Sequence, residues 1–322
     1  MRNVLGMMIT TYIVALAGAV FAQDFPVKPI RLVDGYAPGG GTDVIARLLS
    51  GKRAELLGQS VVVENRPGAT GTIGAASVVR APPDGYTLLV GLSSTIAVSP
   101  SLLTKLPYDT LRDLVAVAQV VTFPNVLVVH PSVPTRNLKD LIALAKARPN
   151  TLNYASGGLG TSNHLAGELL KSMAKVGITH VPYKGGGPAV IAILGGEVDM
   201  LFATMPSATG FVRNGRLRPL AVTGPQRSAA LPEVPTMIES GLSGFEVVSW
   251  MGMLAPAGTP REVILKLNTA INAVMGNAEI RARIAEQASD VVTGTPEQFA
   301  ALIRKDTERW AKVIREAGIK SE

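Results

Sequence analysis

Two glycine-rich segments are the part of the sequence best suited to binding a ligand. Residues 36–43 read YAPGGGTD and residues 155–164 read ASGGLGTSNH, and each follows an apolar run and precedes a helical pattern. The start of a helix exposes backbone N–H groups that lack intrahelical partners, and the helix dipole places partial positive charge there. Glycine lets a ligand approach those groups closely. The two segments therefore predict sites for a small anion that need no cationic side chain.

The residues in and around these segments favour a carboxylate over a phosphate. Neither segment has the G-x-x-x-x-G-K-[ST] or G-x-G-x-x-G spacing of phosphate loops. Thr42, Thr161 and Ser162 add hydroxyl donors, and His164 could donate to a carboxylate. We expect Asp43 to cap its own helix and to make no contact with the ligand's charge. The alternative interpretation is that both segments are only tight strand-to-helix turns.

Residues that could carry out catalysis are scarce. The chain has no cysteine and only three histidines, at positions 130, 164 and 180, so the H-E-x-x-H spacing of a metal site is absent from the sequence. No G-x-S-x-G occurs, and the S-x-x-K at 172–175 lies inside a predicted helix. We therefore expect a binding protein with no catalytic residue, metal or cofactor.

The elements that position the two segments alternate along the chain. We expect strands at residues 30–33, 61–64, 87–90, 126–129, 198–202 and 220–222, and helices at 44–57, 74–80, 138–147, 162–175 and 188–194. This alternation predicts βαβ units and a parallel sheet. Two long helices are expected after Thr259 and Thr295, each with Thr as N-cap and Pro at the first helical position, and Trp310 should pack the second helix.

Composition indicates an exported protein with a large core. Residues 1–22 carry Arg2, an apolar stretch and a small-residue end at Ala22, which is the layout of a secretory signal peptide; an uncleaved membrane anchor is the alternative. Because cysteine is absent, a lipid anchor at a mature N-terminal cysteine is excluded, and we expect a periplasmic protein. The net charge of +7 is dispersed and aromatic residues make up 5%, so no nucleic-acid partner is expected.

Four ordered motifs carry a family resemblance. The segments YAPGGGTDVIARLLS, VVVENRPGATGTIGA, YASGGLGTSNHLAGELL and VPYKGGGPAVIAILGGEVDM together resemble the Bug family, the periplasmic solute receptors of tripartite tricarboxylate transporters. The resemblance implies an α/β fold of the type II periplasmic-binding-protein class, with two lobes joined by two crossings and the ligand in the cleft. It also implies a small carboxylate ligand, such as a di- or tricarboxylate, an acidic amino acid or an aromatic acid, and large and small membrane transporter subunits as partners.

The resemblance also implies a set of ligand-binding residues. In that family main-chain amides of the two glycine loops hold a carboxylate group, which here points to Tyr36, Pro38, Gly39, Gly40, Gly41, Thr42 and Asp43 in the first loop and to Ser156, Gly160, Thr161, Ser162 and His164 in the second. A second set, at or just past predicted strand ends where α/β clefts open, could choose the rest of the ligand. That set is Ser93, Ser94, Thr95, Tyr183, Thr204, Met205 and Pro206.

The crossings are expected near residues 122–125 and 245–250. Lobe 1 then comprises residues 23–123 and 248–322, and lobe 2 comprises residues 124–247. We expect a monomeric receptor that closes on a carboxylate and delivers it to a transporter. Two alternatives stay open at this point: a module that presents its ligand to a membrane sensor kinase, and an enzyme on the same two-lobe architecture.

Overall fold

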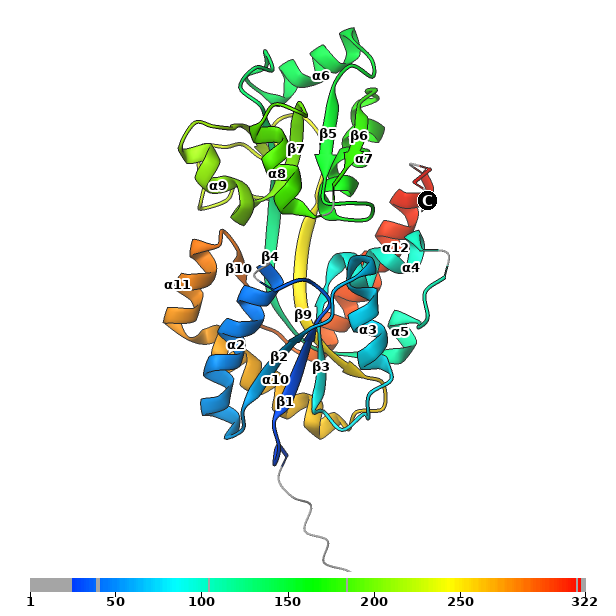
Figure 1. Ribbon diagram of the computed structural model, residues 1–322, viewed down its shortest axis with the longest axis vertical. Helices are drawn as coiled ribbons and strands as arrows, with labels where there is room; N and C mark the ends of the chain where they lie inside the picture. Colours follow the sequence, from blue (N-terminus) through cyan, green and yellow to red (C-terminus); the bar gives the residue numbers. More distant parts are fainter. Residues whose placement is uncertain (1–24, 39–40, 104, 184, 317, 320–322) are drawn as a thin grey trace, which may run out of the picture.

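The computed structural model describes residues 25–38, 41–103, 105–183, 185–316 and 318–319. The predicted signal peptide, Gly39 and Gly40 lie outside these residues. The described chain forms a lower and an upper α/β body, which are joined by the long strands β4 (Leu114–Val129) and β9 (Val248–Pro256) (Figure 1). The expected two-lobe α/β fold is thus confirmed.

The lower body is built on a mixed sheet. Its strands run in the order β2 (Val61–Asn65), β1 (Ile30–Asp34), β3 (Thr87–Leu92), β9 and β4. Strand β1 is parallel to β2 and β3, as the alternating pattern predicts, whereas β9 is antiparallel to β3 and β4. The short strand β10 (Asp290–Val291) pairs with β4. Strands β1 and β3 are nearly continuous apolar runs because helices cover both faces of the sheet.

The helices of the lower body come from both ends of the chain. They are α2 (Gly41–Leu57), η2 (Ala69–Gly71), α3 (Thr72–Val79), η3 (Ser94–Val98), α4 (Ser99–Leu102), α5 (Thr110–Asp113), α10 (Arg261–Gly276), α11 (Ala278–Glu286) and α12 (Pro296–Glu316). At α12 the expected capping box is confirmed, since Thr295 and Gln298 exchange hydrogen bonds between side chain and backbone. At α10 the expected cap is wrong. Pro260 is the N-cap there, and the Thr259 hydroxyl donates back to the Pro256 carbonyl.

The upper body repeats the α/β plan on a smaller sheet. Strands β6 (Thr179–Pro182), β5 (Asn153–Ser156) and β7 (Met200–Thr204) are parallel, and β4 is antiparallel to β7 and to β8 (Arg218–Val222). The helices are α6 (Leu138–Ala147), α7 (Ser162–Ala174), α8 (Gly186–Leu194) and α9 (Met205–Arg213). The Asp199 carboxylate accepts a bond of 2.8 Å from the Asn153 amide, which links the starts of β5 and β7.

Strand β4 belongs to both bodies. As far as Pro124 it pairs with β9, and from Asn125 onward it pairs with β7 and β8. The strand expected at 126–129 is therefore only the last part of a 16-residue strand. Thr223 ties this junction together, because its hydroxyl accepts from the Asn125 amide (2.8 Å) and lies 2.6 Å from the Val247 carbonyl. No helix of the described residues is both long and apolar enough to cross a membrane.

Candidate functional site

The Tyr36 hydroxyl ties together three loops that follow β1, β2 and β3. It lies 3.2 Å from the Thr70 carbonyl, 2.9 Å from Ser94 Oγ and 3.0 Å from Thr95 Oγ1. Burial raises the pKa of this phenol, so it stays protonated and can donate. Three of the predicted ligand residues, Tyr36, Ser94 and Thr95, are thus brought together, and their hydroxyls bind one another and Thr70.

Glycines in the NRPGATG motif let these loops approach closely. A Cβ built on Gly35 would lie 2.6 Å from the Gly71 Cα, so backbone packs on backbone at this point. Gly71 also has a φ of +85°, which a side chain would strain. The motif therefore has a structural role, because its backbone packs against Gly35, directly before the first glycine-rich segment.

Asp43 fixes the start of α2, the helix that begins at Gly41. Its carboxylate accepts from Arg47 Nε (2.8 Å) one turn along the helix and from Asn65 Nδ2 (3.0 Å) at the end of β2. Asn65 Nδ2 also donates to the Tyr36 carbonyl (3.1 Å), so it links the two ends of the segment. Asp43 and Thr42 are buried and Pro38 is exposed. The expectation that Asp43 has a structural role agrees with these bonds.

Most amides of the second glycine-rich segment are used internally. The Gly158 amide donates to Ser156 Oγ (3.0 Å), the Thr161 amide to the Gly158 carbonyl (3.4 Å), and the Gly160 amide to His164 Nδ1 (3.2 Å). The Thr161 hydroxyl also turns back to the Gly158 carbonyl (2.7 Å). The N–H groups of the first turn of α7, beginning at Ser162, have no partner within that helix.

His164 has a different position from the expected one. The side chain is buried, and its ring centroid lies 4.4 Å from that of His180, which in turn is 2.6 Å from Ser156 Oγ. Burial, with His180 close by, lowers the pKa of His164 to about 4, so its ring is neutral at neutral pH. A neutral ring that accepts at Nδ1 holds the Gly160 amide in place, so His164 positions the segment and does not donate to a ligand from that nitrogen.

Only some of the predicted residues of the second set lie at the junction of the two bodies. Ser93 and Ser94 lie at the junction of the two bodies, where Ser93 is buried. The side chain of Met205 is fully buried in the core of the upper body, away from the position expected for a ligand contact. The Tyr183 hydroxyl is 3.5 Å from Glu197, which precedes β7 at the end remote from Thr204. Thr204 Oγ1 bonds Ser207 Oγ (2.9 Å), and Pro206 is exposed.

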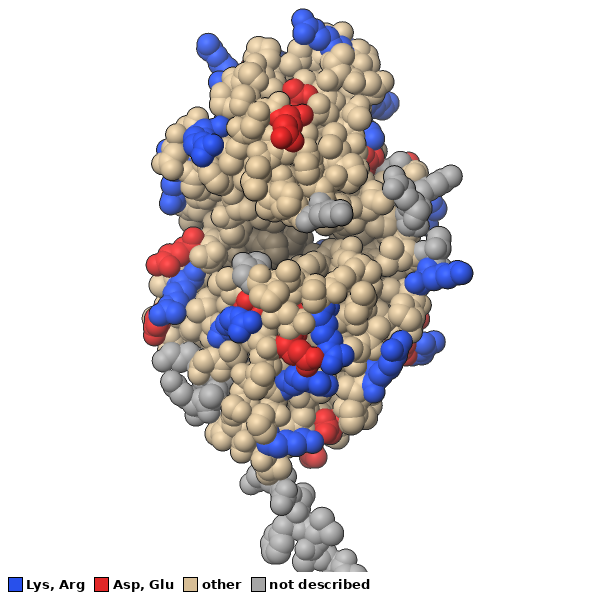
Figure 2. Space-filling model, in the orientation of Figure 1, with Lys and Arg blue, Asp and Glu red and all other residues tan. Residues whose placement is uncertain are grey.

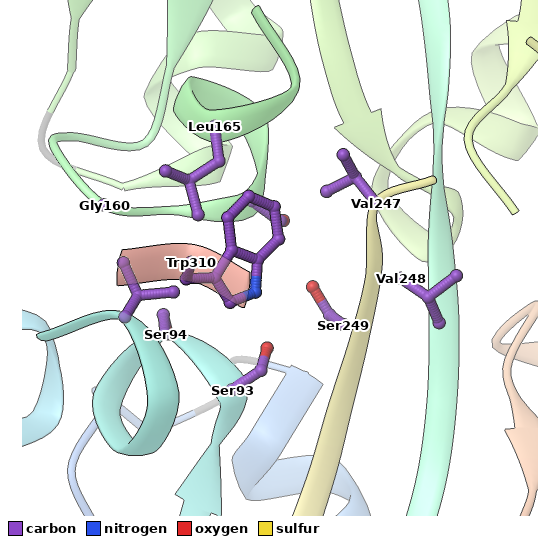
Figure 3. A pocket seen from close by; sticks show the side chains of 10 residues that line it. Ser93, Ser94, Gly160, Leu165, Val247, Val248, Ser249 and Trp310 are labelled. Carbon is purple, nitrogen blue, oxygen red and sulfur yellow. The ribbon is translucent and has the colours of Figure 1, made fainter. Parts of the chain in front are cut away.

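A pocket opens where the two bodies meet. Figure 2 shows a hollow between them whose visible walls are mainly uncharged. On the α12 side of β9 the pocket encloses about 210 Å³, part of it open to solvent. Its lining residues are Ser93, Ser94, Val98, Gly160, Ser162, Leu165, Val247, Val248, Ser249 and Trp310 (Figure 3). Ser162 Oγ also donates to Asn125 Oδ1 (3.3 Å) on β4.

Sequence reasoning missed several of these lining residues. Val247 precedes β9, and Val248 and Ser249 are its first two residues. Their placement at an expected crossing was the available signal. Trp310 was expected only to pack its helix, and it also lines the pocket. Nothing in the local sequence places the last helix beside the cleft, because that contact joins distant parts of the chain.

Comparison with known proteins identifies the family. Residues 45–319 match the family model of the tripartite tricarboxylate transporter family receptor. The chain belongs to this family. Protein BugT of Bordetella pertussis is 40% identical over 318 residues, which covers 98% of this chain and 97% of that protein. The resemblance to the Bug family is thus confirmed, and because the family is one of solute-binding receptors the chain is a binding protein of that kind and not an enzyme.

Two solved structures of relatives contain bound acids. R. palustris Rpa4515 with adipate is 36% identical with a TM-score of 0.85, covering 92% of this chain and 99% of that one. MatC from Rhodopseudomonas palustris with bound malate is 33% identical with a TM-score of 0.81, covering 90% of this chain and 100% of that one. Both acids are small carboxylates.

Proposed function

We propose that this receptor captures a small organic carboxylate between its two bodies and delivers it to the membrane subunits of a tripartite tricarboxylate transporter. The observation that carries the proposal is the carboxylate in two similar structures, combined with two glycine-rich helix starts on the two bodies of this chain. A helix start is a site for an anion because its amides and dipole both favour negative charge.

The donors follow from the internal bonds of each segment. The first-turn amides of α7, from Ser162 to His164, and those of α2 at Gly41 and Thr42 lack intrahelical partners. Asp43 is held by Arg47 and Asn65, and His164 holds Gly160, so these side chains fix the amides in place. We propose that one carboxylate of the ligand lies between the two sets of amides.

Closure of the two bodies would complete the site. We propose lobes of residues 23–123 with 248–322 and of residues 124–247, since β4 changes its pairing partner after Pro124 and β9 begins at Val248. Neither helix start alone surrounds a carboxylate. The ligand would therefore favour the closed arrangement through contacts made only there.

Binding is tested by thermal unfolding of the purified mature chain with a panel of acids that includes adipate, malate, citrate, glutamate and benzoate. A ligand at about a hundred times its Kd stabilises the folded state by roughly 2.7 kcal/mol, so the melting midpoint should rise. If no acid in the panel raises the midpoint, and calorimetry also detects no heat of binding, the carboxylate proposal is wrong.

Transport and location need separate measurements. We propose export through the segment 1–22 to the periplasm, and action as a monomer. Deleting the gene should abolish uptake of the acid that binds the purified protein, and fractionation should recover the mature chain with periplasmic markers. Normal uptake in the deletion strain would separate binding from transport, and sedimentation of the purified protein tests the monomer.

A further inference from the structure

The pocket beside Trp310 has a composition that anion binding at the glycine-rich segments does not explain. Five of its lining residues are apolar, namely Val98, Leu165, Val247, Val248 and Trp310. Four others are serines, and the tenth is Gly160. None of the described lining residues is charged.

Three polar groups meet in this pocket without protein partners. Figure 3 shows the indole nitrogen of Trp310 between the hydroxyls of Ser93 and Ser249. The three residues are 3%, 7% and 6% exposed, and within the part of the chain that the structure describes none of these side-chain groups has a hydrogen bond. By contrast, the indole N–H of Trp250 donates to Asp306 (2.6 Å). Because the three side chains line the pocket and their polar groups have no protein partner there, these groups are available to donate to a ligand atom.

The three groups come from separate elements. Ser93 follows β3, Ser249 lies on β9 and Trp310 lies on α12, while Leu165 and Gly160 of the upper body form the opposite wall. The pocket is therefore shared by the two bodies and adjoins the start of α7 at Ser162. A ligand whose carboxylate lies at that helix start could extend into it.

Arg309 lies next to Trp310 along α12, and its guanidinium is engaged away from the lining hydroxyls. Arg309 lies over the Trp310 ring at 5.0 Å, and its guanidinium donates to the Glu246 carbonyl. The carboxylate of Asp306 lies on the same helix close to Arg309 and is buried. Ser93, Ser249 and Trp310 offer isolated donors without a helix dipole, so desolvating a second ligand carboxylate beside them is less favourable than placing a hydroxyl or carbonyl oxygen there.

We propose that this pocket receives the end of the ligand remote from its carboxylate, and that this end is an uncharged oxygen group on a short hydrocarbon chain. The substrate class is then a hydroxy- or oxo-monocarboxylic acid in preference to a di- or tricarboxylic acid. The inference rests on the proposed function, since it requires a carboxylate at the helix starts.

The class is tested by titration calorimetry of the mature protein with acids matched in length. Hexanoate, 6-hydroxyhexanoate, 6-oxohexanoate and adipate differ only at the far end, and the corresponding four- and five-carbon sets cover shorter ligands. In the best-fitting set the hydroxy or oxo acid should bind at least about tenfold more tightly than the alkanoate, as expected for bonds to buried donors. A diacid that binds more tightly than both overturns the inference and leaves the proposed function standing. Absence of binding by every acid of these sets overturns the inference, and absence of binding by the wider panel as well overturns the proposed function.

Substitutions of the pocket residues test whether the pocket causes the preference for a hydroxy or oxo acid over the alkanoate. Ser249→Ala, Ser93→Ala and Trp310→Phe each remove one donor, and each should reduce the preference for the hydroxy acid over the alkanoate roughly three- to tenfold. Ser132→Ala is the control, because Ser132 is exposed and bonds His130 in the loop after β4. If Trp310→Phe does not fold, the two serine variants still test whether the pocket causes the preference. An undiminished preference in both serine variants overturns the assignment.

Discussion

Gly160 of the upper body packs directly against Leu102 of the lower body. A Cβ built on Gly160 would lie 2.5 Å from Leu102 Cδ2, and the glycine has a φ of +74°. The same glycine donates its amide to His164 and lines the pocket at the junction. A single position thus sets the shape of the second glycine-rich segment and the distance at which the two bodies meet.

Gly160→Val should abolish ligand-induced stabilisation while leaving the fold intact. The side chain would collide with Leu102 and strain the positive φ, so the bodies could not approach to the same distance. Thermal unfolding with and without a tight-binding acid measures the effect. Gly210→Ala is the control, since a Cβ at Gly210 meets nothing within 4 Å and this helix residue should gain slightly in stability. A normal ligand-induced shift in Gly160→Val would show that this contact is not needed for binding.

Tyr36→Phe should weaken ligand binding through loss of loop order. The hydroxyl has three partners in two other loops, at Thr70, Ser94 and Thr95, and a phenyl ring leaves them without it. We expect a loss of stability of about 1–3 kcal/mol and a roughly tenfold rise in Kd. Urea unfolding and calorimetry measure the two effects. Tyr86→Phe is a useful comparison, because the Tyr86 hydroxyl accepts a single bond from the Val27 amide. Equal effects of the two substitutions would contradict the special role of Tyr36.

The sequence predicts the elements of this fold better than their pairing. The parallel unit β1–α2–β2 follows from apolar runs that alternate with a helical pattern. The first part of β4 was missed because Gln119, Thr122 and Pro124 interrupt its apolar run. The insertion of β9 between β3 and β4 depends on contacts far apart along the chain, which a local pattern does not contain.

In the candidate site, too, local features could be predicted from the sequence and long-range contacts could not. Glycine at two helix starts could be recognised from the sequence, since the reason for glycine is local. The hydrogen-bond partner of each amide could not be predicted from the sequence. The Gly160 amide, for example, donates to His164, whose orientation depends on packing against His180. Trp310 was missed for a similar reason, since the position of α12 beside β9 follows from the tertiary fold.

His164 should make the protein less stable at acid pH. Its pKa is lowered to about 4 by burial and by His180, whereas the ordinary value is 6.5. Between pH 6.5 and 4 the unfolded chain binds a proton that the folded chain does not, so stability falls as pH falls through this window, by on the order of 3 kcal/mol in total. Urea unfolding of wild type and His164→Asn at pH 7.5, 6 and 4.5 isolates the contribution. The variant should lose less stability than wild type on acidification, and parallel losses would contradict the assignment.

Asp34 should destabilise the protein at alkaline pH. Its side chain is fully buried, one carboxylate oxygen accepts from the Tyr36 amide (3.1 Å), and the other has no hydrogen bond within the described structure. Burial raises its pKa to about 6 from 3.8, so the ionised form is disfavoured in the folded state above pH 6.

Asp34→Asn should therefore be more stable than wild type at pH 8, by on the order of 1–3 kcal/mol, because the neutral amide removes the buried charge and can keep the bond from Tyr36. The difference should shrink as pH falls from 6 to 3.8 and disappear below pH 3.8, where both folded and unfolded wild type bind the proton. Asp84→Asn is the matched control: Asp84 accepts from the Tyr86 amide (3.0 Å) in the same local arrangement, but its side chain is 39% exposed and pairs with Lys28. A stabilisation of equal size in the control, or none in Asp34→Asn at pH 8, would refute the effect of burial.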